Sequence, residues 1–327
     1  MTLALAGLVA ACAPAASTTL PVPGTAPVLL GAHNDTSTPF NLVSVPALTA
    51  HRYDGRGLRI TGTLARELAF TRYAVAYRSG ALTVTGVMVV PNRAGRHPVV
   101  VIAHGYGDPA RYTTGSMLER EQAMLAENGF VAFQIDYRNY AGSTRESTAP
   151  VARPLGYPAD LVNAVAALKK GRLSFTDTTR IGLFGRSMGG GVVLNALVAR
   201  PHLAQAAVLY SPVSSLAADN YRRWVADDPT LRARVVNAFG TPQSRPAFWR
   251  QASARTYLDR VAVPLQINHG TADPVCPVRW SEATTRALKA AGKDVTLYEY
   301  PGEDHRFDRS WARFMHRFVA FLRRELA

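Results

Sequence analysis

The segment "RIGLFGRSMGGGVVLNALV", residues 180–198, joins two apolar runs through a serine that is flanked by glycines. The first run is typical of a strand buried on both faces, and the second predicts a helix. Residues 185–189, "GRSMG", have the pattern G-x-S-x-G between them. A serine on so sharp a strand-to-helix turn is exposed for reaction, and the glycines leave room for the turn. The segment predicts an α/β fold with Ser187 as the candidate nucleophile.

The rest of the chain also alternates predicted strands with predicted helices. Ordered structure is expected to begin near residue 58, with a hairpin over residues 69–91. Strands are expected over residues 97–105, 130–138, 204–212, 263–270 and 295–302, and helices over residues 117–129, 158–171, 188–200, 278–292 and 310–326. This order predicts a mostly parallel central sheet with helices on both faces, and antiparallel strands at one edge.

Residues 212–260 interrupt the alternation with several prolines, tryptophans and arginines. A long structureless loop is uncommon in a compact domain, so we expect a small helical insert that caps the carboxyl edge of the sheet. Ligands bind at that edge in open α/β sheets. Trp224, Phe248 and Trp249 are candidates to line an acyl pocket there, and the alternative is that they anchor the insert to the domain.

A serine nucleophile needs a general base and a carboxylate that orients the base. Asp273 directly follows one predicted strand and His305 follows the next, so both fall on the edge that carries Ser187. Asp304 and His269 are rivals for these roles. We expect the Asp304 side chain to point elsewhere and His269 to pack or form hydrogen bonds locally. The chain order Ser187, Asp273, His305 predicts a catalytic triad.

Acyl transfer also needs two backbone N–H donors for the oxyanion. One candidate is Met188, which follows the nucleophile at the start of a predicted helix. The other is Tyr106, in the loop "HGYGD" after a predicted strand, where flanking glycines allow close approach. His104 is interpreted as a structural residue that holds this loop. Arg186, inside the G-x-S-x-G pattern, is either a surface residue or a charge at the rim of the site that favours acidic substrates.

The composition argues against several other functions. The formal net charge is +14, but the basic residues are scattered and form no run or aromatic-basic pattern typical of nucleic-acid binding. The two cysteines, Cys12 and Cys276, make neither a disulfide framework nor a metal cluster. We expect no metal, no cofactor and no nucleic-acid partner.

The amino-terminal residues predict export. Residues 1–12 form a short apolar run typical of a signal peptide and too short for a membrane span. Its end, "VAAC", resembles the lipobox of bacterial lipoproteins, in which the cysteine is lipidated, although no Lys or Arg precedes the run. We expect a lipoprotein anchored to the cell membrane only through Cys12, or otherwise a secreted protein. Residues 13–40 are expected to be a flexible tether and residues 41–327 the catalytic domain.

Five motifs in order, "HGYGD", "DYRNYAGS", "GRSMGG", "HGTADPVCP" and "YPGEDHRF", resemble the α/β-hydrolase superfamily. They are most similar to the catalytic domain of the prolyl oligopeptidase family, including its acylaminoacyl-peptidase and dipeptidyl-peptidase-like members. The resemblance spans about residues 70–325. It implies Ser187 as nucleophile, Asp273 as acid and His305 as base, with an oxyanion hole from Tyr106 and Met188.

The departures from that family bear on the substrate. Its peptidases carry a large β-propeller, for which the sequence before residue 70 is too short, and the acidic pair of the dipeptidyl-peptidase branch is not found. We therefore expect a serine hydrolase of small esters, with a peptidase of short peptides as the alternative. A non-catalytic binding module is disfavoured because no triad residue is missing. A polyester depolymerase or lipase is disfavoured because residues 212–260 indicate a covered pocket.

Overall fold

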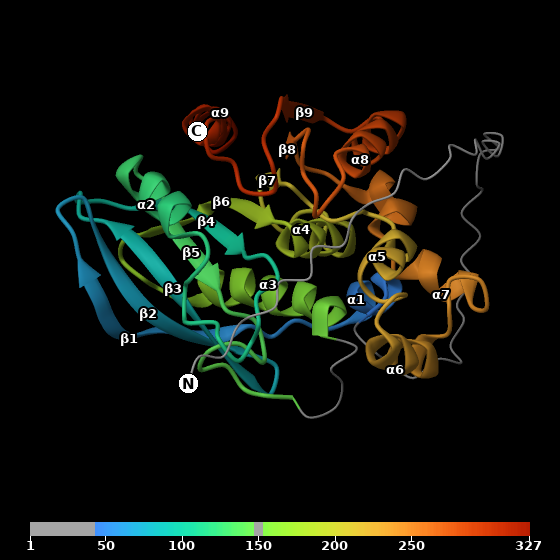
Figure 1. Ribbon diagram of the computed structural model, residues 1–327. Helices are drawn as coiled ribbons and strands as arrows, with labels where there is room; N and C mark the ends of the chain where they lie inside the picture. Colours follow the sequence, from blue (N-terminus) through green and yellow to red (C-terminus); the bar gives the residue numbers. More distant parts are fainter. Residues whose placement is uncertain (1–42, 147–152) are drawn as a thin grey trace, which may run out of the picture. The chain divides into compact units, whose positions relative to one another are not determined.

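The computed structural model describes residues 43–146 and 153–327, which contain one nine-stranded sheet (Figure 1). Its strands are β1 (Arg56–Arg66), β2 (Phe70–Ser79), β3 (Leu82–Pro91), β4 (His97–Ala103), β5 (Val131–Ile135), β6 (Thr176–Arg186), β7 (Ala206–Tyr210), β8 (Leu265–Gly270) and β9 (Val295–Tyr300). Their spatial order is β1-β2-β3-β5-β4-β6-β7-β8-β9. Along this spatial order, the neighbouring strands β1, β2, β3 and β5 pair antiparallel. From β5 through β4 to β9 all neighbouring strands pair in parallel. The predicted α/β fold with a mostly parallel sheet is confirmed.

Helices pack on both faces of this sheet. They are α1 (Val45–Ala50), α2 (Glu119–Glu127), α3 (Arg153–Lys170), α4 (Met188–Ala199), α8 (Arg279–Ala290) and α9 (Trp311–Glu325). Alternate residues of β4 enter two cores: Val99 and Val101 pack in a core with α3 and α4, and Val100 and Ile102 in a core with α2 and α9. Burial on both faces explains the unbroken apolar run of this strand. None of the described helices is long and apolar enough to cross a membrane.

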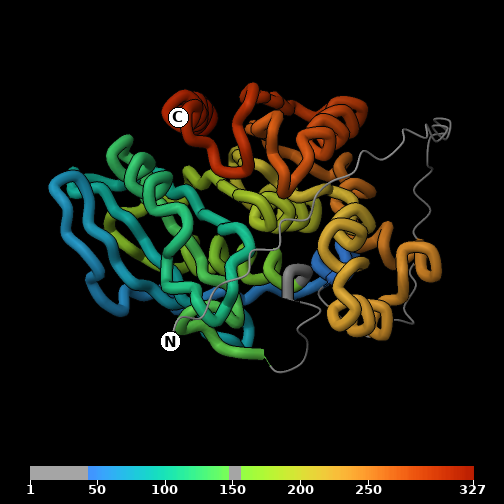
Figure 2. Tube along the Cα trace, viewed as in Figure 1, coloured from blue at the N-terminus to red at the C-terminus, as the bar shows by residue number. Residues whose placement is uncertain are grey.

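Four short helical segments separate β7 from β8. They are α5 (Ala217–Trp224), α6 (Pro229–Phe239), α7 (Pro246–Gln251) and the 3₁₀ helix η1 (Ala254–Arg260). Figure 2 shows this insert, in gold and orange, on the opposite side of the drawing from the blue segments that form β1 and β2. The insert and Val43 form an apolar core of their own, which contains Ala217, Tyr221, Val235, Phe239, Trp249 and Ala252.

The expected start of ordered structure near residue 58 is wrong. Helix α1 ends before that residue, and strand β1 begins two residues before it. Helix α1 begins after Ser44, whose hydroxyl accepts a hydrogen bond from the Ala47 N–H at 3.3 Å. Strand β1 is exposed along most of its length, so it lacks the alternation that marks a half-buried strand. Helix α3 also begins five residues before its expected start at Pro158, which it contains.

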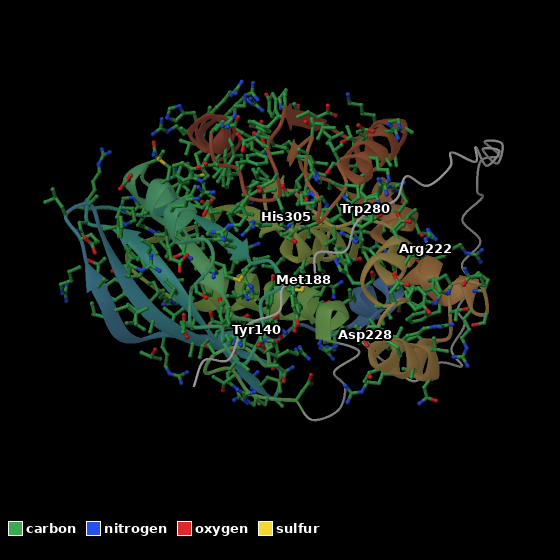
Figure 3. The ribbon with its side chains drawn as sticks, viewed as in Figure 1. Tyr140, Met188, Arg222, Asp228, Trp280 and His305 are labelled. Atoms are coloured by element: carbon green, nitrogen blue, oxygen red, sulfur yellow. The ribbon has the colours of Figure 1, made fainter. Side chains whose placement is uncertain are left out.

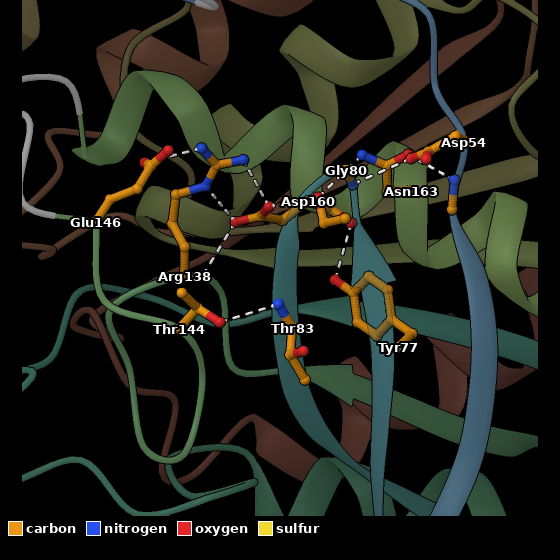
Figure 4. Close-up of polar contacts among 11 residues, drawn as sticks. Asp54, Tyr77, Gly80, Thr83, Arg138, Thr144, Glu146, Asp160 and Asn163 are labelled. Atoms are coloured by element: carbon orange, nitrogen blue, oxygen red, sulfur yellow. Dashed lines mark hydrogen bonds and ion pairs between the residues drawn. The ribbon is translucent and has the colours of Figure 1, made fainter.

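A buried ion pair ties the loop after β5 to α3 (Figure 4). Arg138 donates from Nε to Asp160 Oδ2 at 2.9 Å and from Nη2 to Asp160 Oδ1 at 2.8 Å. The fully buried Asp160 carboxylate also accepts from the Arg138 N–H and from the Ser79 hydroxyl at the end of β2. A bidentate contact of this kind fixes both position and orientation. The Asp160 carboxylate thereby joins the end of β2, the loop after β5 and helix α3.

Candidate active site

Ser187 lies at the turn between β6 and α4 with φ 55° and ψ −120°. This backbone conformation is strained for a serine and persists only where its surroundings impose it. A side chain on Gly189 would place Cβ 1.9 Å from the Ala103 carbonyl oxygen, and one on Gly185 would place it 2.3 Å from that of Gly189. The Ser187 N–H donates to the Tyr210 carbonyl at 2.9 Å. The glycines and the neighbouring strands therefore force the turn that presents Ser187.

Asp273 and His305, which follow β8 and β9, contact each other. His305 Nδ1 lies 2.7 Å from Asp273 Oδ2, and Figure 3 marks His305 among the central side chains. Asp273 Oδ1 accepts from the N–H groups of Val275 and Cys276, both at 2.8 Å. Burial alone would raise the pKa of Asp273, but hydrogen bonds from His269 and His305 hold it below its ordinary value. The carboxylate is therefore ionised at neutral pH and accepts a hydrogen from His305 Nδ1.

His269, on β8, is a second histidine partner of Asp273. Its Nε2 lies 2.7 Å from the Cys276 carbonyl oxygen and 3.2 Å from Asp273 Oδ2, and its Nδ1 lies 2.6 Å from Ser281 Oγ. Local hydrogen bonding was expected of this buried ring, but its contact with Asp273 was not. The four-residue spacing in "HGTAD" is the signal that could have indicated it. Across the described residues, no three His, Cys, Asp or Glu side chains are grouped to hold a metal ion.

The buried Cys276 interacts with both Ser187 and Asp273. Burial raises its pKa to about 12, and the charge of Asp273 acts in the same direction, whereas a hydrogen bond with the Ser187 side chain opposes them. The thiol is therefore neutral and lies beside the Ser187 side chain. Because the Cys276 N–H also donates to Asp273, Cys276 connects the three predicted triad residues into one neighbourhood.

The loop after β4 approaches Ser187 closely. A side chain on Gly105 would place Cβ 3.2 Å from Ser187 Cβ, so only a glycine fits without displacement. Tyr106, the next residue, is 69% exposed. His104 is fully buried and stacks against neighbouring tyrosine rings, in line with its interpretation as a structural residue. Met188 is the first residue of α4, where helix N–H groups lack intrahelical acceptors.

The loop over residues 301–310 is held by a buried carboxylate that sequence analysis missed. Glu303 accepts from the N–H groups of Asp308 and Ser310 at 2.8 and 2.6 Å. Asp304, the rival acid, instead accepts from the Arg306 N–H at 2.6 Å within the loop. Glu303 thus fixes both ends of the segment that carries the candidate base.

The structure places two of the three candidate pocket residues inside the insert. Phe248 stacks on Phe239 with ring centroids 4.8 Å apart, and Trp249 is 7% exposed in the core of the insert. These two side chains therefore pack within the insert, and a role in an acyl pocket stays a prediction. Two adjacent aromatic residues on a short helix can line a pocket or anchor the insert, so sequence alone did not decide between these roles.

Trp224, the third candidate, is 38% exposed at the end of α5 and contacts the Trp280 ring, with centroids 5.7 Å apart. The preceding residue, Arg223, donates from Nη2 to the Pro274 carbonyl oxygen at 2.7 Å. Pro274 directly follows Asp273. Helix α5 is therefore attached to the loop of the candidate acid, and Trp224 lies near that attachment.

A model of the prolyl oligopeptidase family matches residues 116–327, which is well over half of the sequence. The chain belongs to the prolyl oligopeptidase family. The matched region includes Ser187, Asp273 and His305. Membership confirms the resemblance drawn from the five motifs and places the chain among the serine hydrolases.

Known proteins resemble the chain over different extents. The acylamino-acid-releasing enzyme of Rattus norvegicus is 25% identical over 217 residues, which cover 64% of this chain and 28% of the relative. The chain thus spans less than a third of that relative's length.

Solved structures show the same fold at lower identity. A putative dipeptidyl aminopeptidase IV from Bacteroides ovatus ATCC 8483 has a TM-score of 0.64 at 19% identity, covering 79% of this chain and 36% of that one. An acetyl xylan esterase from Paenibacillus sp. R4 has a TM-score of 0.61 at 19% identity, covering 85% and 92%.

Proposed function

We propose that the protein cleaves small carboxylic esters through an acyl-enzyme on Ser187. The observation that carries this proposal is the 2.7 Å contact between His305 and Asp273, at the same sheet edge as the strained Ser187. A serine, an imidazole and a carboxylate in this order form a nucleophile, a base and an orienting group.

Each residue has one role in the proposed reaction. Ser187 Oγ attacks the ester carbonyl while its proton passes to His305 Nε2, and Asp273 stabilises the resulting imidazolium through Nδ1. The N–H groups of Met188 and Tyr106 stabilise the oxyanion. His305 then returns the proton to the leaving alcohol, and water hydrolyses the acyl-enzyme by the same steps.

Two considerations support an ester as substrate. An acetyl xylan esterase is among the solved structures that share this fold. An alkoxide or phenoxide is also a better leaving group than an amine, so the same triad cleaves esters with less precise positioning. Peptidase action on short peptides is the second candidate, and family membership and the acylamino-acid-releasing relative favour it.

The first test compares the protein with its Ser187→Ala variant on p-nitrophenyl esters of graded acyl length and on aminoacyl and dipeptidyl anilides. We expect fast cleavage of short esters, little cleavage of anilides, and loss of at least about a thousandfold in kcat for the variant. Comparable cleavage of anilides would favour the peptidase. No cleavage by folded protein would overturn both.

We also propose that the protein is exported and anchored through lipidated Cys12. Residues 1–42 lie outside the described residues, and the support is the sequence "VAAC" after an apolar run. Metabolic labelling with an alkyne fatty acid should mark the full chain and not its Cys12→Ser variant. Equal labelling of both would refute the anchor.

A further inference from the structure

Arg186 is buried beside the nucleophile without a neutralising partner. It is 6% exposed, so the interpretation as a surface residue is wrong. Within the described residues its Nε has no hydrogen-bond partner, and no carboxylate forms an ion pair with its guanidinium. Its recorded contacts are a 3.5 Å hydrogen bond from Nη2 to the His305 carbonyl oxygen and the ring of Tyr210, 5.6 Å from the guanidinium carbon.

This guanidinium faces a cavity of about 230 Å³. It is lined by Met117 and Tyr210, by the arginines Arg120, Arg186 and Arg306, and by the carboxylates Glu119 and Glu121. Arg120 and Arg306 are exposed at its rim, whereas Arg186 and Tyr210 are buried. The cavity is thus large enough for a small organic group and has arginine both at its wall and at its mouth.

The cavity is lined by chain neighbours of Ser187 and His305, and Arg186 contacts the His305 carbonyl oxygen. Arg186 precedes Ser187 in the chain, and Arg306 follows His305. Met117 lies against the loop of Tyr106, because a Cβ on Gly107 would be 3.0 Å from Met117 Sδ. The proposed base returns its proton to the leaving group, so a cavity whose Arg186 contacts the backbone of His305 is suited to hold a group carried by the leaving group.

The carboxylates around the cavity leave positive charge in excess. Glu121 is buried and accepts from Arg120 Nε at 3.0 Å and from Trp311 Nε1 at 2.8 Å, so its charge is already matched. Glu119 is exposed and interacts electrostatically with Arg72. Among the described residues neither Arg186 nor Arg306 forms an ion pair, and the charge of Glu121, shared with Arg120, is the carboxylate charge that acts on Arg186.

A buried charge without a counterion is costly. Burial lowers the pKa of Arg186, and the charges of Arg306 and Arg120 act in the same direction, whereas Tyr210 and the charge of Glu121 oppose it. A ligand carboxylate would offset that cost, since a guanidinium presents paired N–H donors that match the two oxygens of a carboxylate.

We infer that this cavity is a subsite for a carboxylate carried by the leaving group of the substrate. The inference rests on the proposed function and adds to it a substrate class: esters, or amides, of an acid-bearing alcohol or amine. Arg186 binds the carboxylate at the wall of the cavity, and Arg306 attracts it at the mouth.

The test uses three acetate esters that differ only on the leaving group: 4-nitrophenyl acetate, its 3-carboxy derivative, and the methyl ester of that derivative. We expect kcat/KM for the carboxylate to exceed that for the methyl ester by about tenfold to a hundredfold, the range of a charged hydrogen bond. Arg186→Met should bring this ratio close to one. Arg306→Gln, at an exposed position, should lower it partly and does not depend on refolding of the turn at Ser187.

The matched control is Arg286→Gln, which removes one exposed positive charge on α8 and should keep the wild-type ratio. A ratio near one in the wild type, or an equal ratio in Arg186→Met, overturns the inference. A drop in Arg286→Gln equal to that in Arg306→Gln would show attraction by the overall positive charge and also overturn it.

A binding measurement separates this inference from the proposed function. Calorimetry on Ser187→Ala should show that 5-hydroxy-2-nitrobenzoate, the product of the carboxy ester, binds at least about tenfold more tightly than 4-nitrophenol, and that adding Arg186→Met removes the difference. If no ester is cleaved but this binding is seen, the anion subsite stands and the proposed hydrolase fails. If esters are cleaved and the two phenols bind equally, the hydrolase stands and the subsite fails.

Discussion

His269 determines how Asp273 is held. Its Nε2 faces two oxygen acceptors, the Cys276 carbonyl and the Asp273 carboxylate, so Nε2 must carry a hydrogen. In the neutral ring Nδ1 then accepts from the Ser281 hydroxyl, 2.6 Å away. This fixes the tautomer and makes His269 a donor to the same carboxylate oxygen that accepts from His305. His269 is a positioning residue for the proposed triad.

Replacing His269 should lower turnover more than substrate binding. We expect His269→Phe to reduce kcat by about tenfold to a hundredfold, the value of one hydrogen bond to a charged group, with KM changed by less than about threefold. His269→Gln, whose amide can still donate, should recover part of kcat. Steady-state kinetics on a short ester measures both. A variant that loses stability but keeps kcat would assign His269 a structural role alone.

At the scale of elements, the turn between β6 and α4 is decided by glycines. Gly189 touches the β4 backbone so closely that no side chain fits, whereas a Cβ on Gly62, in β1, would meet nothing within 4 Å. Both positions have ordinary backbone angles for a non-glycine residue, because neither has a positive φ. Substituting these two glycines therefore separates the steric cost of an added side chain from the effect of reduced backbone freedom on stability.

Gly189→Ala should destabilise the protein by about 3 kcal/mol or more, because it forces β4 and α4 apart. The matched Gly62→Ala should change stability by less than about 0.5 kcal/mol. Urea unfolding followed by circular dichroism measures both. Equal effects would mean that the turn yields to a side chain and that glycine is not required there.

The turn was predictable from sequence because its glycines and apolar flanks obey local rules, and the same holds for the strands buried on both faces. Strand β1 was not predictable, since its residues are exposed and its pairing with β2 depends on partners later in the chain. The sequence left the roles of Phe248 and Trp249 open because a short aromatic pattern does not reveal which surface covers it. The usual preference of arginine made a surface position one of two alternatives for Arg186, and its burial beside the cavity overrides that preference.

At the scale of the whole molecule, the Arg138–Asp160 pair joins β2, the loop after β5 and α3. Breaking a buried pair leaves one charge without its partner, whereas removing both charges avoids that cost. The pair connects residues 22 positions apart on different elements, so no local pattern in the sequence indicates it.

Asp160→Ala should destabilise the protein by about 3–5 kcal/mol. The double variant Asp160→Ala, Arg138→Met should lose clearly less than the sum of the single losses, because it removes both buried charges and leaves only the partly exposed Glu146 carboxylate without its Arg138 partner. A double-mutant cycle by urea unfolding gives the coupling. Strictly additive losses would show that the two charges do not act as a pair.

Strand β1 has a consequence for how copies of the molecule behave together. It ends the sheet, and no other strand of the described chain pairs with its outer edge. Free strand edges recruit edges of other molecules into fibrous aggregates, and charges and bulges discourage this. Arg56, Arg59 and Arg66 lie along β1, and its pairing with β2 is irregular at three points. The arginines and the irregular pairing of β1 therefore discourage polymerisation through this free edge of the sheet.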